Sequence, residues 1–253
     1  MQADLRPLGQ RLSFILTTLA VTGMLSLPVM ASQSSGDTST DTSSSDTKTT
    51  TVEVEVQVEQ DRQVTDNEDG SKTVTSSRTV TNTQTGDSHT INKTSDVVKN
   101  ENGTHTITTS GTATNTRNDN VKTLNATTNV TRTETGRSFD RTRHIANSNG
   151  AYTEETVKGL VTRNSDGSRT RSSDVQGTHT NAKGKTVTYT ADRNLTSSRN
   201  ADGSRSYKAS ETRNDSNGRT TRRDVEGTSV REGNKIKRTA KVTKTRSGGK
   251  NSD

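Results

Sequence analysis

The architecture of this chain follows from the segment Asn67-Glu68-Asp69-Gly70-Ser71-Lys72-Thr73, a short turn sequence that recurs along the chain. Its core is Asn-x-(Asp/Asn)-Gly, followed by small, basic and hydroxyl residues. Asn-Gly and Asp-Gly pairs tolerate the positive φ angles of hairpin turns, whereas the Thr and Val residues between the copies prefer strands. The pattern predicts a series of β-hairpins. Further copies begin at Asn100, Asn164 and Asn200, with weaker copies at Gly150 and Gly218.

The turn residues are evenly spaced, at about 14 to 19 residues from one to the next. In Val52–Glu59 a valine occupies every second position, which places valines on one face of a strand and acids on the other. No proline follows Pro28, so every backbone N–H beyond it is free to join a ladder. Helices are disfavoured because the chain has no apolar stripe at helical spacing.

Composition limits the core that these strands can build. Only 22% of the residues are hydrophobic and 2% are aromatic, so little apolar burial is available to offset the conformational entropy lost on folding. The sequence predicts an all-β fold, an extended antiparallel meander of repeated hairpins without a compact core. A largely disordered chain is the alternative. A parallel β-solenoid ranks third, because its coils need a nearly constant length.

The sequence divides into four regions. Residues 1–31 are predicted to be a signal peptide, with Arg6 and Arg11 before an apolar run that ends at Val29-Met30-Ala31. Residues 32–50 form a Ser/Thr/Asp-rich flexible linker, 51–246 the β-hairpin repeat region and 247–253 a disordered basic tail. We therefore expect a secreted, periplasmic or cell-surface protein, exported without disulfides since it has no cysteine, and with no membrane span after cleavage.

A longer repeat lies near the end of the chain. The segment Asp174-Val175-Gln176-Gly177-Thr178 matches Asp224-Val225-Glu226-Gly227-Thr228, and the two glycines are 50 residues apart. This spacing covers about three of the shorter units, which indicates that a larger block was copied and then diverged.

The sequence contains no pattern typical of an enzyme. It has no Gly-x-Ser-x-Gly elbow and no strand-to-helix unit that would supply an oxyanion site. His89, His105 and His179 occupy slots that Lys or Arg fill in related turns, so they are interpreted, with His144, as polar positions on exposed strands. We predict no catalytic, cofactor-binding or metal site, and no cofactor.

Basic residues are the candidates for binding. The chain has a formal net charge of +7, and its cations lie mostly after residue 66. Cations two residues apart lie on the same strand face, at a spacing that could match successive anionic groups of a polymer. Binding such a polymer would release its counterions, which favours association. The alternative is charge that only solubilises the protein and protects strand edges. The candidate polyanion-binding residues are Arg141, Arg143, Arg169, Arg171, Lys235, Lys237, Lys244 and Arg246.

The leading functional hypothesis is a non-enzymatic structural or adhesive repeat protein of the cell envelope or exterior. The alternative is a binding module for anionic polymers such as nucleic acid, lipopolysaccharide or acidic polysaccharide. Frequent Thr-x-Thr runs add ice binding or functional amyloid as weaker alternatives, with self-association as a further option. An outer-membrane barrel is not expected, because it needs an apolar lipid-facing band and aromatic girdles.

Overall fold

The computed structural model describes residues 48–117, 120–233 and 235–248. The chain divides into two units, residues 1–42 and 43–253, and all described residues belong to the second. The predicted signal peptide, most of the predicted linker and most of the predicted tail lie outside the described residues. The first strand begins at Lys48 and the last ends at Ser247.

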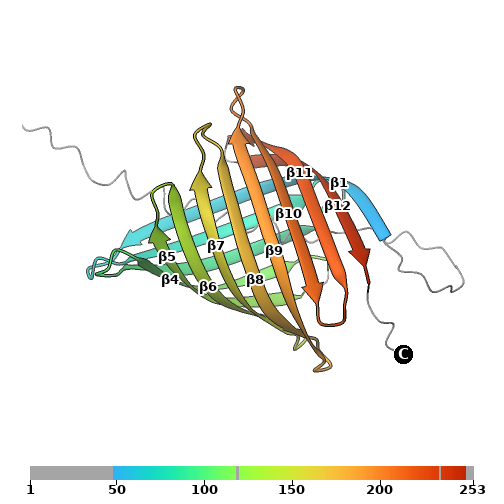
Figure 1. Ribbon diagram of the computed structural model, residues 1–253. Helices are drawn as coiled ribbons and strands as arrows, with labels where there is room; N and C mark the ends of the chain where they lie inside the picture. The colour runs from blue at the N-terminus through green and yellow to red at the C-terminus, as the bar shows by residue number, and fades with distance from the viewer. Residues whose placement is uncertain (1–47, 118–119, 234, 249–253) are drawn as a thin grey trace, which may run out of the picture. The chain divides into compact units, whose positions relative to one another are not determined.

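Twelve antiparallel strands form one closed barrel (Figure 1). Each strand pairs with its neighbours in sequence, and β1 pairs with β12. No helix occurs among the described residues. The strands are β1 (Lys48–Asp66), β2 (Lys72–Asn82), β3 (Ser88–Lys99), β4 (His105–Asn115), β5 (Val121–Arg132), β6 (Gly136–Asn147), β7 (Tyr152–Arg163), β8 (Arg169–Thr180), β9 (Thr186–Arg199), β10 (Arg205–Asp215), β11 (Thr220–Glu232) and β12 (Lys235–Ser247).

The structure is a closed ring of strands, whereas the sequence predicted an open meander. The all-β, antiparallel hairpin prediction is confirmed, but the predicted absence of a compact core is wrong. The β1–β12 ladder runs from the Lys48–Arg246 pair to the Glu59–Lys235 pair and removes both free sheet edges. A single closed layer needs apolar residues on its inner face alone, so a hydrophobic content too low for a two-layer core is enough for a barrel.

Side chains alternate between the inside and the outside of the barrel. On β9, Tyr189, Ala191 and Leu195 are buried, whereas their neighbours Thr190 and Thr196 are exposed. Because nothing among the described residues covers the outer face of this single layer, the buried set faces inward. Its apolar members include Val58, Val74, Val97, Ile107, Val130, Phe139, Val157, Val175, Val225 and Val242.

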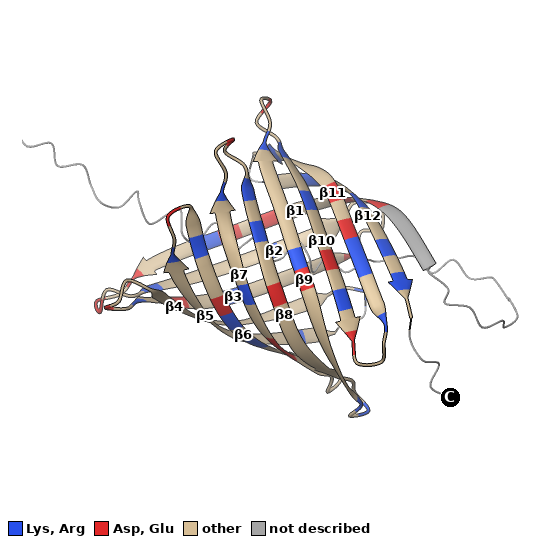
Figure 2. Ribbon diagram, viewed as in Figure 1, with Lys and Arg blue, Asp and Glu red and all other residues tan. Residues whose placement is uncertain are grey.

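The outer face is polar. Thr, Ser and Asn dominate it, and charged residues occur among them. Figure 2 shows the positions of the charged residues along the strands. Among the described residues the exposed large hydrophobic side chains are scattered over five strands and form no continuous band; they are Val64, Val98, Val121, Leu160 and Val230. The described part of the chain also contains no helix with the length and apolar character needed to cross a membrane.

The predicted turns close the hairpins as expected. In the first copy, Gly70 has a φ of 78° and donates its N–H to the Asn67 carbonyl at 3.0 Å, while the Asn67 side chain donates to Ser71 Oγ at 2.8 Å. The four strong copies join β1 to β2, β3 to β4, β7 to β8 and β9 to β10. Since antiparallel strands alternate in direction, all four lie on the same rim.

Inward glycines are covered by aromatic rings on the adjacent strand. Tyr189 lies opposite Gly177, and Tyr207 lies opposite Gly227. A Cβ atom at Gly177 would lie 2.7 Å from Tyr189 Cζ, and one at Gly227 would lie 2.7 Å from the Tyr207 hydroxyl. A backbone carbonyl also blocks each position, since the Thr239 oxygen would lie 2.2 Å from a Cβ atom at Gly227 and the Glu154 oxygen 2.9 Å from one at Gly177. Glycine is therefore required here because a ring and a neighbouring strand occupy the space of a side chain, and the ring restores packing beside the bare backbone.

Substitution Gly177→Ala is expected to destabilise the barrel by about 1 to 3 kcal/mol, because the new methyl group overlaps the Tyr189 ring. Denaturant unfolding of the wild type, Gly177→Ala, Tyr189→Ala and the double variant measures this. In the Tyr189→Ala background the cost of Gly177→Ala should fall but not vanish, because the added methyl group would still lie 2.9 Å from the Glu154 carbonyl oxygen. Equal costs in both backgrounds would show that the ring does not impose the glycine.

Candidate functional site

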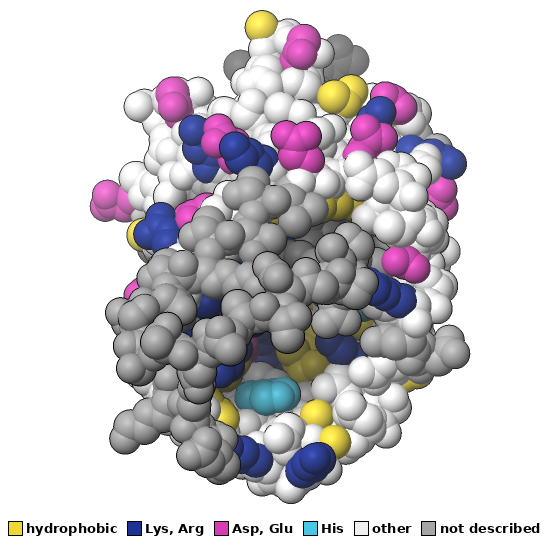
Figure 3. All heavy atoms as spheres, turned by 90° about the vertical axis from the view of Figure 1, so that its right-hand side faces the viewer, with side chains coloured by type: hydrophobic (Ala, Val, Ile, Leu, Met, Phe, Trp, Pro, Cys, Tyr) yellow, Lys and Arg dark blue, Asp and Glu magenta, His cyan; other side chains and the backbone are white. Residues whose placement is uncertain are grey.

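Five cationic residues on five strands gather inside the barrel. Each occurs in phase with a buried neighbour two positions away, as Arg78 does with Val80 and Arg238 with Ala240. Figure 3 shows Lys, Arg and His side chains within the hollow of the molecule, and Asp and Glu mainly on its outer surface. The five residues, named here the lumenal cation cluster, are Arg78 (β2), Lys93 (β3), Arg141 (β6), Arg171 (β8) and Arg238 (β12).

The members of this cluster lie close enough to repel one another. Burial, together with the charge of Arg238, lowers the pKa of Arg78 to about 10. Burial and nearby arginines, Arg141 first among them, lower the pKa of Arg171 to about 9. The pKa of Lys93 is lowered by burial and then by Arg141 and Arg78. These shifts reflect the free-energy cost of holding like charges together away from water.

Several N–H groups of the cluster are buried without a partner. Nε and Nη2 of Arg78 and Nε of Arg238 make no hydrogen bond within the described part of the chain. Arg141 Nε donates to Thr128 Oγ1 at 3.0 Å, and the Arg171 guanidinium lies 4.5 Å from the centre of the Phe139 ring. Buried polar atoms are rarely left unpaired in proteins, so these atoms mark a place where further acceptors fit.

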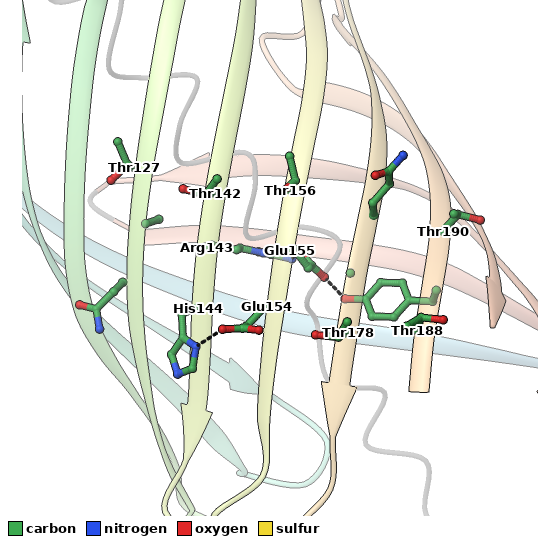
Figure 4. Close-up of a pocket in the computed structure, with 15 residues that line it drawn as sticks. Thr127, Thr142, Arg143, His144, Glu154, Glu155, Thr156, Thr178, Thr188 and Thr190 are labelled. Carbon is green, nitrogen blue, oxygen red and sulfur yellow. Dashed lines mark hydrogen bonds and ion pairs between the residues drawn. The ribbon is translucent and has the colours of Figure 1, made fainter. Parts of the chain in front are cut away.

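A second interior group is neutralised by its own acids. Glu155 on β7 binds Arg143 and the Tyr189 hydroxyl (Figure 4). It also lies 3.7 Å from Arg193. Arg193 Nε also donates to a Glu211 oxygen at 2.7 Å. Burial alone would raise the pKa of the Glu155 carboxyl, but Arg143 and Arg193 outweigh it and hold that pKa below its usual value.

These two acids form no ion pair with the lumenal cation cluster, although the charge of Glu155 partly offsets the lowering of the Arg141 pKa. Glu155 and Glu211 both bind arginines outside the cluster, and no ion pair between a cluster member and a carboxylate occurs among the described residues. The interior therefore contains one satisfied ionic network and, beside it, one concentration of unbalanced positive charge.

The structure separates the residues predicted from sequence to bind polyanions. Arg141, Arg143 and Arg171 meet in the interior, as described above. Arg169 lies where β8 begins, close to Arg163 and Arg205. Lys235 and Lys237 face outward and pair with Glu59 at 3.1 Å and Glu55 at 3.2 Å. Lys244 and Arg246 lie in phase with the buried Val242 near the end of β12, where Lys244 is half-buried and Arg246 is exposed. The eight residues form no single stripe.

Sequence reasoning missed Arg78, Lys93 and Arg238. The available signal was their phase, since each occupies the same strand face as a buried residue of its own strand, for example Val80, Ser95 or Ala240. The prediction of exposed histidines is wrong for His105, which is 7% exposed because it shares the inward face of β4 with Ile107. The described residues contain no cluster of metal-binding side chains.

A groove of about 810 Å³ crosses the exposed face of β5 to β9 (Figure 4). Its lining is rich in hydroxyl groups, with one threonine on each of several successive strands. The exposed threonines that line it are Thr127, Thr142, Thr156, Thr188 and Thr190. His144 Nδ1 also lies 3.6 Å from a Glu154 carboxylate oxygen.

This fold and these two features define a closed antiparallel barrel with a cationic interior and a polar outer surface. No protein-family model matches the chain, and no curated protein matches it in sequence. The crystal structure of the β domain of the Bordetella autotransporter BrkA is similar at a TM-score of 0.23, with 9% sequence identity, over 78% of this chain and 98% of that one. A likeness this slight supports no inference about the chain.

Substitution Glu155→Gln is expected to destabilise the barrel by about 3 kcal/mol at pH 7, because it leaves the half-buried Arg143 without its acid and Arg193 with Glu211 alone. The folded-state pKa of Glu155 lies below 4.5, so its contribution is fully present above that pH and is lost as the pH falls through the folded value. Urea unfolding between pH 7 and pH 3 should show the difference between wild type and variant shrinking below pH 4.5. A constant difference would contradict the assignment.

Proposed function

We propose that this protein is an exported, non-enzymatic barrel that binds an anionic ligand in its interior. The supporting observation is the lumenal cation cluster, in which five cations from five strands have no carboxylate partner among the described residues. Guanidinium groups suit this task because they stay charged and bind phosphate, sulfate and carboxylate oxygens through paired N–H groups.

The energetics favour a ligand over a purely structural role. Arg141 is buried and the other four cations are half-buried. An unpaired charge held away from water costs free energy, and each unsatisfied buried N–H adds about 1 to 3 kcal/mol. The neighbouring Arg143–Glu155–Arg193 network shows how the same fold neutralises cations with its own acids. The cluster lacks such acids, so an external anion would recover the energy that the empty cluster costs.

The position of the cluster changes the class of ligand expected from the sequence. A ring of twelve strands about 4.8 Å apart, tilted by about 40°, is roughly 24 Å across between opposite backbones, and inward side chains narrow it further. A small anion, or one extended segment of a polyanion, fits such an interior better than a wide polymer laid over the surface. The outward Lys235 and Lys237 already have partners in Glu59 and Glu55.

The proposed location and the absence of catalysis rest on separate observations. The predicted leader supports export, and the polar outer face supports a protein surrounded by water in the periplasm, at the cell surface or in the medium. The proposed absence of catalysis rests on the sequence alone, which contains no Gly-x-Ser-x-Gly nucleophile motif. A structural or adhesive role is compatible with ligand binding, since both use the same rigid scaffold.

Thermal unfolding of the mature chain with inorganic phosphate, pyrophosphate and a heparin hexasaccharide tests the proposal. An anion at 100 times its Kd should stabilise the wild type by about 2.7 kcal/mol, which raises Tm by roughly 5 to 10 °C. The double variant R78M/R238M should lose this response. Without ligand it should be as stable as the wild type or more stable, since it removes two repelling buried charges.

The double variant K235Q/K237Q is the matched control, because it removes two cations from the outer face of the same strand, β12. It should respond to anions as the wild type does. If K235Q/K237Q loses the response and R78M/R238M keeps it, the anion binds on the outer surface and the proposal is wrong. Absence of any response in the wild type would reject the proposal. A response to the hexasaccharide alone would identify a polyanion segment as the ligand.

A further inference from the structure

From the groove across β5 to β9 we infer a second binding site, on the outer face, for an uncharged polysaccharide. This inference is independent of the interior anion site, because the groove is lined mainly by the opposite face of the same strands. Its walls carry hydroxyl and amide groups, and its charged residues are paired with each other. His144 pairs with Glu154 at the surface, and Arg143 pairs with Glu155 beneath it.

The register of the strands arranges one polar side chain per strand in a row. Thr127 lies opposite Thr142, Thr142 opposite Thr156, Thr156 opposite Gln176, and Gln176 opposite Thr190. Adjacent strands are about 4.8 Å apart. A polysaccharide that runs across the strands would thus meet about one hydrogen-bonding side chain for each sugar unit.

The hydroxyl groups of this row are available to a ligand. Thr127, Thr142, Thr156 and Thr190 make no side-chain hydrogen bond within the described residues. Elsewhere, hydroxyl groups of adjacent strands satisfy one another, as in the Thr79–Thr90 pair at 3.0 Å and the Thr180–Thr186 pair at 2.8 Å. Each free hydroxyl is both donor and acceptor, which matches the hydroxyl groups of a sugar.

One edge of the groove also offers stacked rings. The Tyr152 ring stacks on the His144 imidazole, with the ring centres 5.6 Å apart and the planes at 23°. The imidazole lines the groove, so a sugar that occupies its end meets a flat ring beside the hydroxyl row. A few oriented polar groups combined with a ring surface are typical of small-molecule sites. An ionic polymer is a poorer match, because hydroxyl and amide groups make up most of the exposed lining.

Affinity electrophoresis tests this inference. The mature protein is run in native gels that contain hydroxyethyl cellulose, galactomannan or dextran, each uncharged. We expect at least one polysaccharide to retard the wild type, and the double variant T142V/T156V to bind at least fivefold more weakly. Valine keeps the shape and strand preference of threonine, so the exposed sites should tolerate it.

The double variant T75V/T94V is the matched control, since it alters another pair of exposed threonines that lie directly opposite each other, on β2 and β3. It should be retarded as strongly as the wild type, as should R78M/R238M, which tests the interior site separately. Equal retardation of T142V/T156V and the wild type would overturn the inference, as would no retardation in any gel. Thermal hysteresis lost only in T142V/T156V would assign the row to ice instead.

Discussion

The pairing of β1 with β12 is the constraint that gives every other residue of the described barrel its environment. A strand directs successive side chains to opposite faces, but an open sheet of this composition would leave both faces wet. Once the ring closes, the two faces become an inside and an outside. Ordinary alternation then places Val, Tyr and Arg in the interior and Thr, Asn and Glu in contact with solvent. The same geometry forms the cation cluster and the outer groove.

Main-chain ladders, tight turns and a thin inner layer together replace a conventional core. The inner layer is only partly apolar. Large rings that cover glycines, such as Tyr189 over Gly177, fill spaces that aliphatic side chains would fill in a more hydrophobic sequence. Its remaining volume holds charge, in two arrangements. One contains acids that balance Arg143 and Arg193, and the other has none. We therefore interpret the Arg143–Glu155–Arg193 network as structural support and the lumenal cation cluster as a candidate binding site.

The sequence predicted what local chemistry determines. The turn at Asn67 and the alternation after Val52 fixed the hairpins and their faces, because both act over a few residues. Closure was not predictable in this way, since nothing local indicates that Val52 meets Val242 across the whole chain. Paired cations such as Arg141 and Arg143 were visible as a pattern, whereas Arg78 and Arg238 have no second cation two residues away on the same strand face. They meet only in the folded ring. The groove left no signal, because threonine is common on every strand.

The repeated block around Gly177 and Gly227 bears on how such a ring could have grown. These glycines lie on β8 and β11, which are three strands apart and run in opposite directions. Insertion of a three-strand unit inverts the path of everything that follows it. One such event would bring the first and last strands together in parallel and break the uniform pattern, and a second event would restore it. A closed antiparallel barrel can therefore grow by three-strand insertions only if an even number of insertions occurs, which keeps the number of strands even. The twelve strands of this barrel satisfy that rule.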